Sequence, residues 1–332
     1  MKFSVGYQTN ADLWAAIIEF REVLGEVYFP WGPFANGRGF VADLEAQRHM
    51  ESDLNLYSKI GLRMNLLLNG NCYGRQSLAR SFYKSVGDSV DELVNRWKLT
   101  SVTTTSPLIA KFVKSNFPDL EVRASINMEI GTIAGLEYVV DLFDGFYLKR
   151  EFNRDLARIR EIRAWCDKRG KKLYMLANNG CLNFCSLRTF HDNLVSHERE
   201  IVEMDNAYEF PGLCHEYLSC PEKRSALLTL SNFVRPEDIS LYEGLFDGIK
   251  LATRTNRNPG AVVRAYLAGR FAGNILDLTE PSHAQSFYPE IIENQRFPAD
   301  FGQHVTTCNH QCENCSYCSS VLRDATVKLE TE

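Results

Sequence analysis

The sequence predicts an α/β fold, a (β/α)8 TIM-like barrel, followed by a cysteine-rich, metal-binding C-terminal extension. Strand-like segments alternate with amphipathic helical segments eight times within about the first 270 residues, which is the pattern and size of such a barrel. A doubly wound open sheet is the alternative, because it also joins parallel strands through helices.

The first unit shows the pattern that repeats along the chain. A strand is predicted at residues 3–8, and Leu13, Ile17 and Phe20 then recur at helical spacing. Asn10 is placed to cap that helix. The predicted strands span residues 3–8, 26–31, 63–69, 102–106, 121–127, 146–151, 172–177 and 248–254. Further helices are predicted at residues 44–59, 77–97, 131–140, 154–168 and 261–271, with another opened by Pro107.

The alternation breaks after the seventh strand and again near the C-terminus. We therefore predict a barrel over residues 1–273, with a cysteine-bearing insertion at about residues 178–232. Residues 274–332 form the predicted extension, which holds the last four cysteines.

Composition and charge narrow the class of protein. The chain is 45% hydrophobic and 24% charged, without an apolar run that could span a bilayer, and this favours an ordinary soluble enzyme with no membrane partner. A net charge of −5 gives no overall basic field, so nucleic acid is not favoured as a partner. The N-terminus does not resemble a signal peptide, which predicts a cytoplasmic protein with reduced cysteines.

Four cysteines lie within eleven residues near the C-terminus: Cys308, Cys312, Cys315 and Cys318. Such dense thiol spacing is typical of iron-sulfur clusters, and sites built from four cysteines also commonly hold zinc. We predict a metal centre here, with a 4Fe-4S cluster or zinc as the occupant.

A second group of cysteines follows the seventh predicted strand. Cys181 and Cys185 lie in its exit loop, at the barrel face where active sites form. Cys220 lies further along, and Cys214, with Cys72 as the alternative, would complete a four-thiolate set. Cys166 is instead predicted to pack in the core.

Polar residues near these cysteines are candidates for chemistry. Arg188, His191 and Glu198 are spaced to share one face of a single predicted helix after Cys185. His191 is the preferred acid-base group, since histidine changes charge near neutral pH. A solvated helix face is the alternative.

Cations at strand ends suggest a site for an anion. Lys250 and Arg254 share one side of the eighth predicted strand, and Arg235 lies nearby in the sequence. Arg150 lies near the end of the sixth predicted strand. Each is predicted to bind a substrate carboxylate, with a structural ion pair or a solvated helix start as the alternative.

Several motifs resemble the peptidase U32 family. They are Gly-Cys-x3-Cys at residues 180–185, Tyr-Leu-Ser-Cys-Pro-Glu at 217–222 and Asn-Phe-Val-Arg-Pro-Glu-Asp at 232–238. Gly-Ile-Lys-Leu-Ala-Thr-Arg at 248–254 and Ala-Tyr-Leu-Ala-Gly-Arg at 265–270 extend the likeness through the eighth unit.

The resemblance implies an iron-sulfur enzyme. Better characterised branches of that family resemble oxygen-independent hydroxylation proteins with a four-cysteine 4Fe-4S cluster, and Cys181, Cys185 and Cys220 map to cluster ligands. This chain lacks the family's usual pair of cysteines upstream of Cys181 and adds Cys308 to Cys318, which suggests a second cluster.

The predicted function is therefore oxygen-independent hydroxylation, or a related redox modification, of a small anionic metabolite or of a peptide or cofactor precursor. A redox partner protein or a U32-like partner subunit is expected. The alternatives are a metal-dependent peptidase and a non-catalytic electron-transfer subunit. The chain has neither a Gly-x-Ser-x-Gly nor a His-Glu-x-x-His motif, which disfavours the peptidase.

Overall fold

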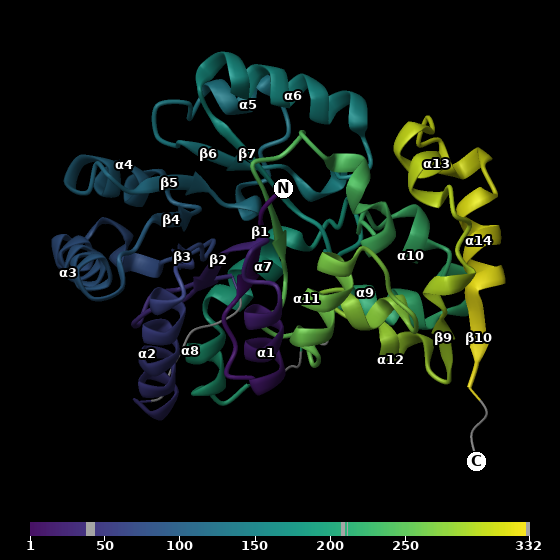
Figure 1. Cartoon of the computed structure of the whole chain (residues 1–332), viewed down its shortest axis with the longest axis horizontal. Coiled ribbons are helices and arrows are strands. Elements are labelled where there is room, and N and C mark those ends of the chain that lie inside the picture. The colour runs from purple at the N-terminus through teal and green to yellow at the C-terminus, as the bar shows by residue number, and fades with distance from the viewer. Residues whose placement is uncertain (38–43, 207–209, 211, 330–332) are drawn as a thin grey trace.

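Eight parallel strands close into a barrel, as predicted (Figure 1). The structure, a computed structural model, describes residues 1–37, 44–206, 210 and 212–329. The first and last strands pair in parallel, with Phe3 opposite Ile249, so the ring has no open edge and the doubly wound sheet is excluded.

Every predicted strand is present, although most are shorter than predicted. The strands are β1 (Phe3–Gly6), β2 (Leu24–Phe29), β3 (Arg63–Leu68), β4 (Ser101–Thr104), β5 (Glu121–Ala124), β6 (Gly145–Tyr147), β7 (Lys172–Leu176) and β8 (Gly248–Leu251). The prediction at residues 121–127 is too long because Ser125 accepts a hydrogen bond from the backbone N–H of Asn127 and starts a 3-10 turn.

The barrel helices follow the predicted order. They are α1 (Ala11–Glu19), α2 (Leu44–Lys59), α3 (Arg80–Trp97), α4 (Pro107–Asn116), α5 (Ile133–Glu137), α6 (Leu156–Arg169) and α11 (Pro259–Ala268). Asn10 caps α1 by accepting from the Leu13 N–H at 2.9 Å, and Pro107 opens α4, both as predicted. The helix predicted at residues 77–97 is present as α3 but begins at Arg80, because the residues before it form a 3-10 turn, η1 (Gly74–Leu78).

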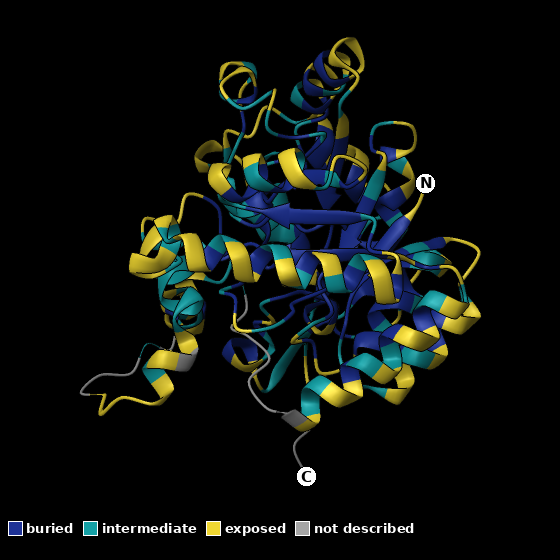
Figure 2. Cartoon of the chain, turned by 90° about the vertical axis from the view of Figure 1, so that its left-hand side faces the viewer, coloured by how far each residue is buried: buried dark blue, intermediate teal, exposed yellow. Residues whose placement is uncertain are grey.

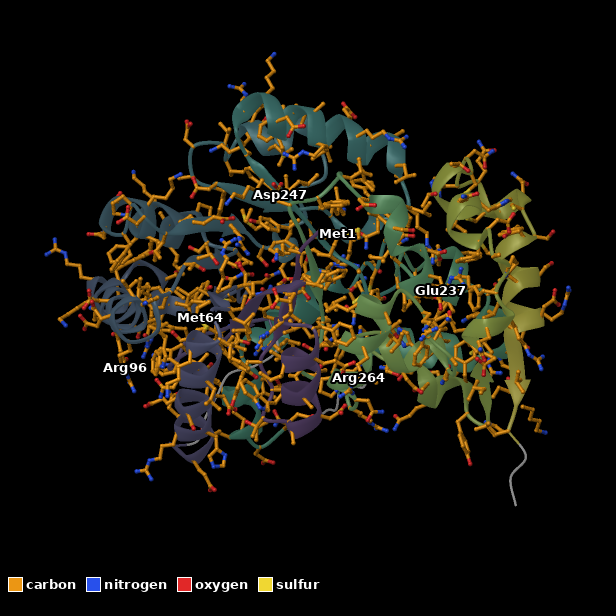
Figure 3. All side chains as sticks on the ribbon, in the orientation of Figure 1. Met1, Met64, Arg96, Glu237, Asp247 and Arg264 are labelled. Carbon is orange, nitrogen blue, oxygen red and sulfur yellow. The ribbon has the colours of Figure 1, made fainter. Side chains whose placement is uncertain are left out.

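The core lies inside the barrel and between the strands and the helices. Figure 2 shows buried strands surrounded by helices that expose one face. Met64 on β3 is fully buried, whereas Arg96 on α3 and Arg264 on α11 belong to the outer helices (Figure 3). The periodic apolar spacing that predicted the helices thus marks the face that packs on the strands.

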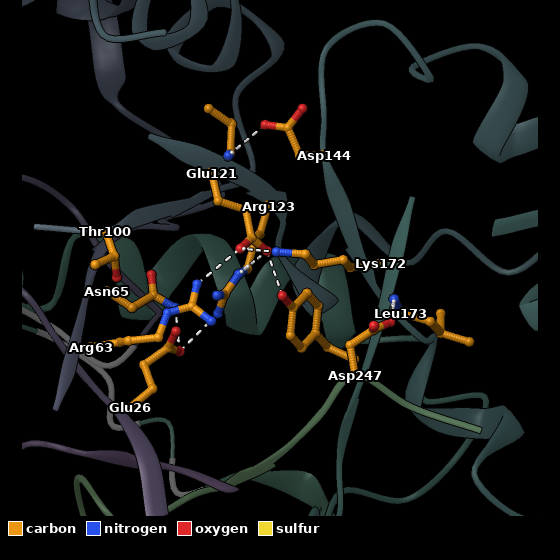
Figure 4. Close-up of polar contacts among 12 residues, drawn as sticks. Glu26, Arg63, Asn65, Thr100, Glu121, Arg123, Asp144, Lys172, Leu173 and Asp247 are labelled. Atoms are coloured by element: carbon orange, nitrogen blue, oxygen red, sulfur yellow. Dashed lines mark hydrogen bonds and ion pairs between the residues drawn. The ribbon is translucent and has the colours of Figure 1, made fainter. Parts of the chain in front are cut away.

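A polar network fills the barrel at the ends where its strands begin (Figure 4). The Arg123 side chain is 1% exposed, and it donates to Glu26 at 2.8 Å and to Glu121 at 2.7 Å. Burial opposes ionisation of Glu121, but Arg123, Lys172 and Tyr174 outweigh it and hold the pKa of that carboxyl well below its usual value. This network lies at the barrel end opposite the strand exits, where most of its residues line a cavity of about 530 Å³.

The insertion between β7 and β8 is a series of short helices. It contains α7 (Arg188–Ser196), α8 (Glu198–Val202), α9 (Leu213–Ser219), η4 (Pro221–Lys223), α10 (Ala226–Thr229) and η5 (Pro236–Tyr242). Residues 207–209 and 211 of the predicted insertion lie outside the described residues. The insertion leads from the exit loop of β7 back to β8.

The C-terminal extension packs against that insertion. It comprises η6 (Ile275–Leu278), α12 (Ala284–Phe287), β9 (Glu290–Ile292), η7 (Asn294–Arg296), α13 (Phe301–Thr307), η8 (Cys312–Asn314), α14 (Tyr317–Ala325) and β10 (Thr326–Lys328). In Figure 1, α12 lies beside α9 and α14 beside α10, and both pairs are in contact. Phe301 and Leu322 belong to the same buried core as the barrel residues. The domain division at residue 273 stays a prediction.

None of the described helices is long and apolar enough to cross a membrane.

Candidate functional site

A cavity of about 380 Å³ opens where the barrel strands end. It gathers residues from the ends of several strands and from the insertion, as expected for the functional face of this fold. Predicted site residues that line it are Arg150, Cys181, Cys185, Arg188, His191, Glu198, Cys214, Lys250 and Arg254. Positions far apart in the sequence therefore meet at one mouth.

The exit loop of β7 is held by a buried amide. The Asn178 side chain donates to the carbonyls of Ala252 and Leu278, both at 2.8 Å, and accepts from the Ala252 N–H at 2.7 Å. A Cβ on Gly180 would lie 2.2 Å from the carbonyl oxygen of Pro281, so only glycine fits there. These constraints fix the loop that carries Cys181.

Two guanidinium groups flank Cys181. Arg150 Nη1 lies 3.8 Å from Cys181 Sγ, while its Nη2 donates to Asn127 at 2.9 Å. Burial works against the charge of Arg188, but Cys181 and Glu129 outweigh it and raise the pKa of Arg188. The positive charges of Arg150 and Arg188 are thus placed to offset a thiolate at Cys181.

The remaining thiols of this group differ in position. Cys185 is exposed and Cys214 is half-buried, and both line the mouth. Burial, with the charges of Cys181 and Cys185, raises the pKa of Cys214 to about 11. Cys220 follows the C-terminal end of α9 and does not line this cavity. Cys72 lines a larger neighbouring cavity of about 850 Å³.

The larger cavity is lined by few of the predicted site residues. Of the predicted site residues it contains Cys72 alone, beside His197 and Glu200. We therefore place the candidate site at the smaller mouth, because cations, thiols and a histidine converge there.

Arg188, His191 and Glu198 do not share one helix, which corrects the prediction. α7 ends at Ser196 and α8 begins at Glu198, since His197 leaves the helical conformation. All three side chains nevertheless line the mouth. Arg188 forms ion pairs with Glu129 at 2.6 Å and with Glu151 at 3.2 Å.

Two of the predicted anion-binding cations lie at the mouth on the β8 side. Lys250 is buried, with its Nζ 3.8 Å from the centre of the Tyr28 ring. Arg254 Nη2 donates to Asn36 at 2.8 Å. Arg150, Lys250 and Arg254 thus lie on the walls of the mouth, together with the carboxylates of Asp192, Glu198 and Glu280.

Arg235 does not line the mouth. Its guanidinium forms a two-pronged ion pair with Asp238, at 2.7 and 3.0 Å, and lies 4.9 Å from the centre of the Phe297 ring. The ion-pair alternative is what the structure shows at this position.

The four C-terminal thiols lie together at the junction of barrel and extension. Burial raises the pKa of Cys318 to about 11; nearby Arg154 opposes this, while Cys308, Cys312 and Cys315 add to it. Arg154 is buried and donates to the carbonyls of Leu228 at 2.8 Å and Phe233 at 3.1 Å. Four thiols beside a buried cation fit a soft metal or an anionic cluster.

Sequence reasoning missed a group of imidazoles at the edge of the mouth. Ligand atoms of Cys214, His215 and His283 all lie within 4.8 Å of one another. His283 belongs to the extension, and burial lowers its pKa to about 4. Its adjacency to His215 gives no local sequence signal, because 67 residues separate them.

The comparisons with known proteins agree with this architecture. No family model matches the chain. The uncharacterized protease MJ1657 of Methanocaldococcus jannaschii is 26% identical over 284 residues, which cover 83% of this chain and 81% of that protein. The structure of the U32 peptidase Mk0906 superposes with a TM-score of 0.55 at 19% identity, covering 76% of this chain and 92% of that one.

The U32 peptidase shares the fold, the protease from M. jannaschii shares sequence over most of both chains, and the motifs around β7 and β8 resemble the same family. The chain is therefore similar in sequence to the M. jannaschii protease and in fold to the U32 peptidase.

Proposed function

We propose that this chain is an iron-sulfur-dependent, U32-like enzyme that hydroxylates, or otherwise changes the redox state of, an anionic small molecule or peptide without using dioxygen. The observation that carries the proposal is the pairing of thiols and cations at one mouth. Cys181 and Cys185 line the same cavity as Arg150 and Arg188, and the Arg150 guanidinium lies 3.8 Å from Cys181 Sγ.

The donor set fits a cluster with thiolate ligands. Such a centre carries net negative charge, which the two guanidinium groups are placed to offset. Cys181, Cys185 and Cys220 would hold a 4Fe-4S cluster, with Cys214 or Cys72 as the fourth ligand. When bound, the cluster would transfer electrons one at a time.

The side chains of the mouth would bind and orient the substrate. Lys250 and Arg254 would hold a carboxylate or a similar anion on the β8 side. His191, which also lines the cavity, would accept a proton from the reacting group.

Hydroxylation without dioxygen must balance. Replacing a substrate C–H by C–OH with water as the oxygen source releases two protons and two electrons. We expect a redox partner protein, or a partner subunit, to accept the electrons. A hydroxylated organic donor is the other oxygen source, and it would be reduced as the substrate is oxidised.

The C-terminal centre would serve this electron flow or hold the extension in place. Cys308, Cys312, Cys315 and Cys318 would bind a second 4Fe-4S cluster, with zinc as the alternative. The buried Arg154 beside them supports an anionic occupant.

A metal-dependent peptidase is the second candidate, favoured by the names of the M. jannaschii protein and of the U32 peptidase structure. The two functions separate in one assay with fluorescein-labelled casein under anaerobic conditions. We expect no cleavage by the wild-type protein, which should be coloured and reducible by dithionite. Cleavage without reductant that survives Cys181→Ser would favour the peptidase and overturn the redox proposal.

A further inference from the structure

Three donor side chains meet at the edge of the mouth, where the insertion touches the extension. Cys214 and His215 lie on α9, and His283 directly precedes α12. Among the residues that the structure describes, they form the one group of three or more side chains whose donor atoms all lie within 4.8 Å.

The spacing of the imidazole nitrogens matches a shared ion. His215 Nδ1 and His283 Nδ1 are 3.4 Å apart. Two nitrogens bound to one tetrahedral zinc ion at about 2.0–2.1 Å lie about 3.4 Å from each other. Cys214 Sγ lies within 4.8 Å of a ring nitrogen of each histidine.

His283 is oriented as a ligand histidine usually is. Its ring is fully buried, and its Nε2 lies 2.9 Å from the carbonyl oxygen of Gly180. Because a carbonyl can only accept, Nε2 carries the hydrogen and the neutral ring points its Nδ1 lone pair at His215. A backbone carbonyl that fixes the second nitrogen is the usual outer support of a metal-binding histidine.

The ligand atoms indicate which class of metal ion would bind, and the mouth cavity gives that ion a path to the site. One thiol and two imidazoles, without a carboxylate in the group, suit a borderline divalent cation and not Mg²⁺ or Ca²⁺. Cys214 and His215 both line the mouth cavity, so an ion and a further ligand can reach the site from there.

We propose that Cys214, His215 and His283 bind a zinc-class divalent cation, separate from both cysteine centres. The ion would connect α9 to the extension. The exit loop of β7 lies beside the site, because its Gly180 carbonyl accepts a hydrogen bond from His283. This site assigns Cys214 to the ion and not to the cluster. It goes beyond the proposed function and does not depend on it.

The test counts metals in the full-length protein. Wild-type protein, His215→Gln, His283→Gln and the exposed control His49→Gln are purified without oxygen, equilibrated with Zn²⁺, desalted, and analysed for zinc, iron and sulfide. We expect both mouth variants to lose one zinc ion per chain with iron and sulfide unchanged, and His49→Gln to match the wild type. His215→Gln alters a half-buried ring, so it decides the question if His283→Gln does not fold.

Two outcomes overturn the proposal. Wild-type zinc content in folded His215→Gln would mean that the two imidazoles simply share a hydrogen bond. Loss of iron and sulfide with zinc retained would assign the histidines to the cluster. Cys181→Ser separates this site from the proposed function, because it should remove cluster iron and keep the histidine-dependent zinc.

Discussion

At the scale of single residues, burial separates cysteines that the sequence alone presents as similar. Cys166 lies on α6 and is fully buried, and burial raises the pKa of its thiol to about 12. Cys185 and Cys315 are exposed. Since the thiolate is the reactive form, accessibility and pKa together decide which cysteines react or bind metal.

This difference predicts the order of alkylation. In native protein stripped of metal with a chelator, iodoacetamide at neutral pH should modify Cys185 and Cys315 well before Cys166. Peptide mapping by mass spectrometry at several reaction times measures the order. Labelling of Cys166 at the rate of Cys185 would place Cys166 outside the core.

At the scale of elements, the start of the barrel strands is held by a buried ion network. Arg123 on β5 joins Glu26 on β2 to Glu121 at the start of its own strand, and the Tyr174 ring on β7 lies 4.3 Å from the guanidinium. Removing one partner of a buried pair leaves an uncompensated charge, which costs far more than breaking a surface pair.

Arg123→Met should therefore destabilise the protein by about 3–5 kcal/mol. Arg96→Met is the matched control, because Arg96 pairs with Glu51 and Glu92 on the surface and such pairs contribute about 0–1 kcal/mol each. Urea unfolding followed by circular dichroism measures both. Equal losses in the two variants would mean that the network contributes little.

The same network should make the stability of the folded protein depend on pH. The pKa of Glu121 is lowered in the folded state, so its contribution is complete above the unfolded pKa of about 4.3 and is lost as pH falls through the folded value. The difference in Tm between wild type and Glu121→Gln should thus shrink from about pH 7 to about pH 3. A difference that stays constant would contradict this.

At the scale of the whole molecule, the sequence predicted the barrel and much of its mouth. Alternating periodicity located all eight barrel strands but not β9 and β10, and the barrel strand ends then placed Cys181, Arg150 and Lys250 on one face. Contacts made by distant segments could not be predicted. His283 reaches the mouth only because the extension folds back on α9.

The direction in which a side chain points also could not be predicted from the sequence. Arg235 was a candidate for the mouth, but the turn at η5 aims it at Asp238, three residues away. Spacing along a chain gives a helical face only while the helix continues, and the break at His197 therefore separated Glu198 from α7. Pairings of this kind depend on how turns orient the chain.

Arg154 links the barrel to the extension and should support the C-terminal centre. Arg154→Met removes the charge that opposes the raised pKa of Cys318, so metal affinity there should fall by about 10- to 100-fold. Arg154→Lys, which keeps the charge, should lose less. Metal content after dialysis against a graded chelator series measures both, and equal loss in the two variants would mean that the charge is not the cause.

The proposed function requires two separate iron-sulfur centres, one at the barrel mouth and one in the extension. Iron and sulfide counts with EPR spectra of anaerobically purified wild-type protein, Cys185→Ala, Cys315→Ala and the core control Cys166→Ser test it most directly. The account predicts that Cys185→Ala loses the mouth centre, Cys315→Ala loses the other, and Cys166→Ser loses neither. A colourless wild-type protein that contains only zinc would contradict it.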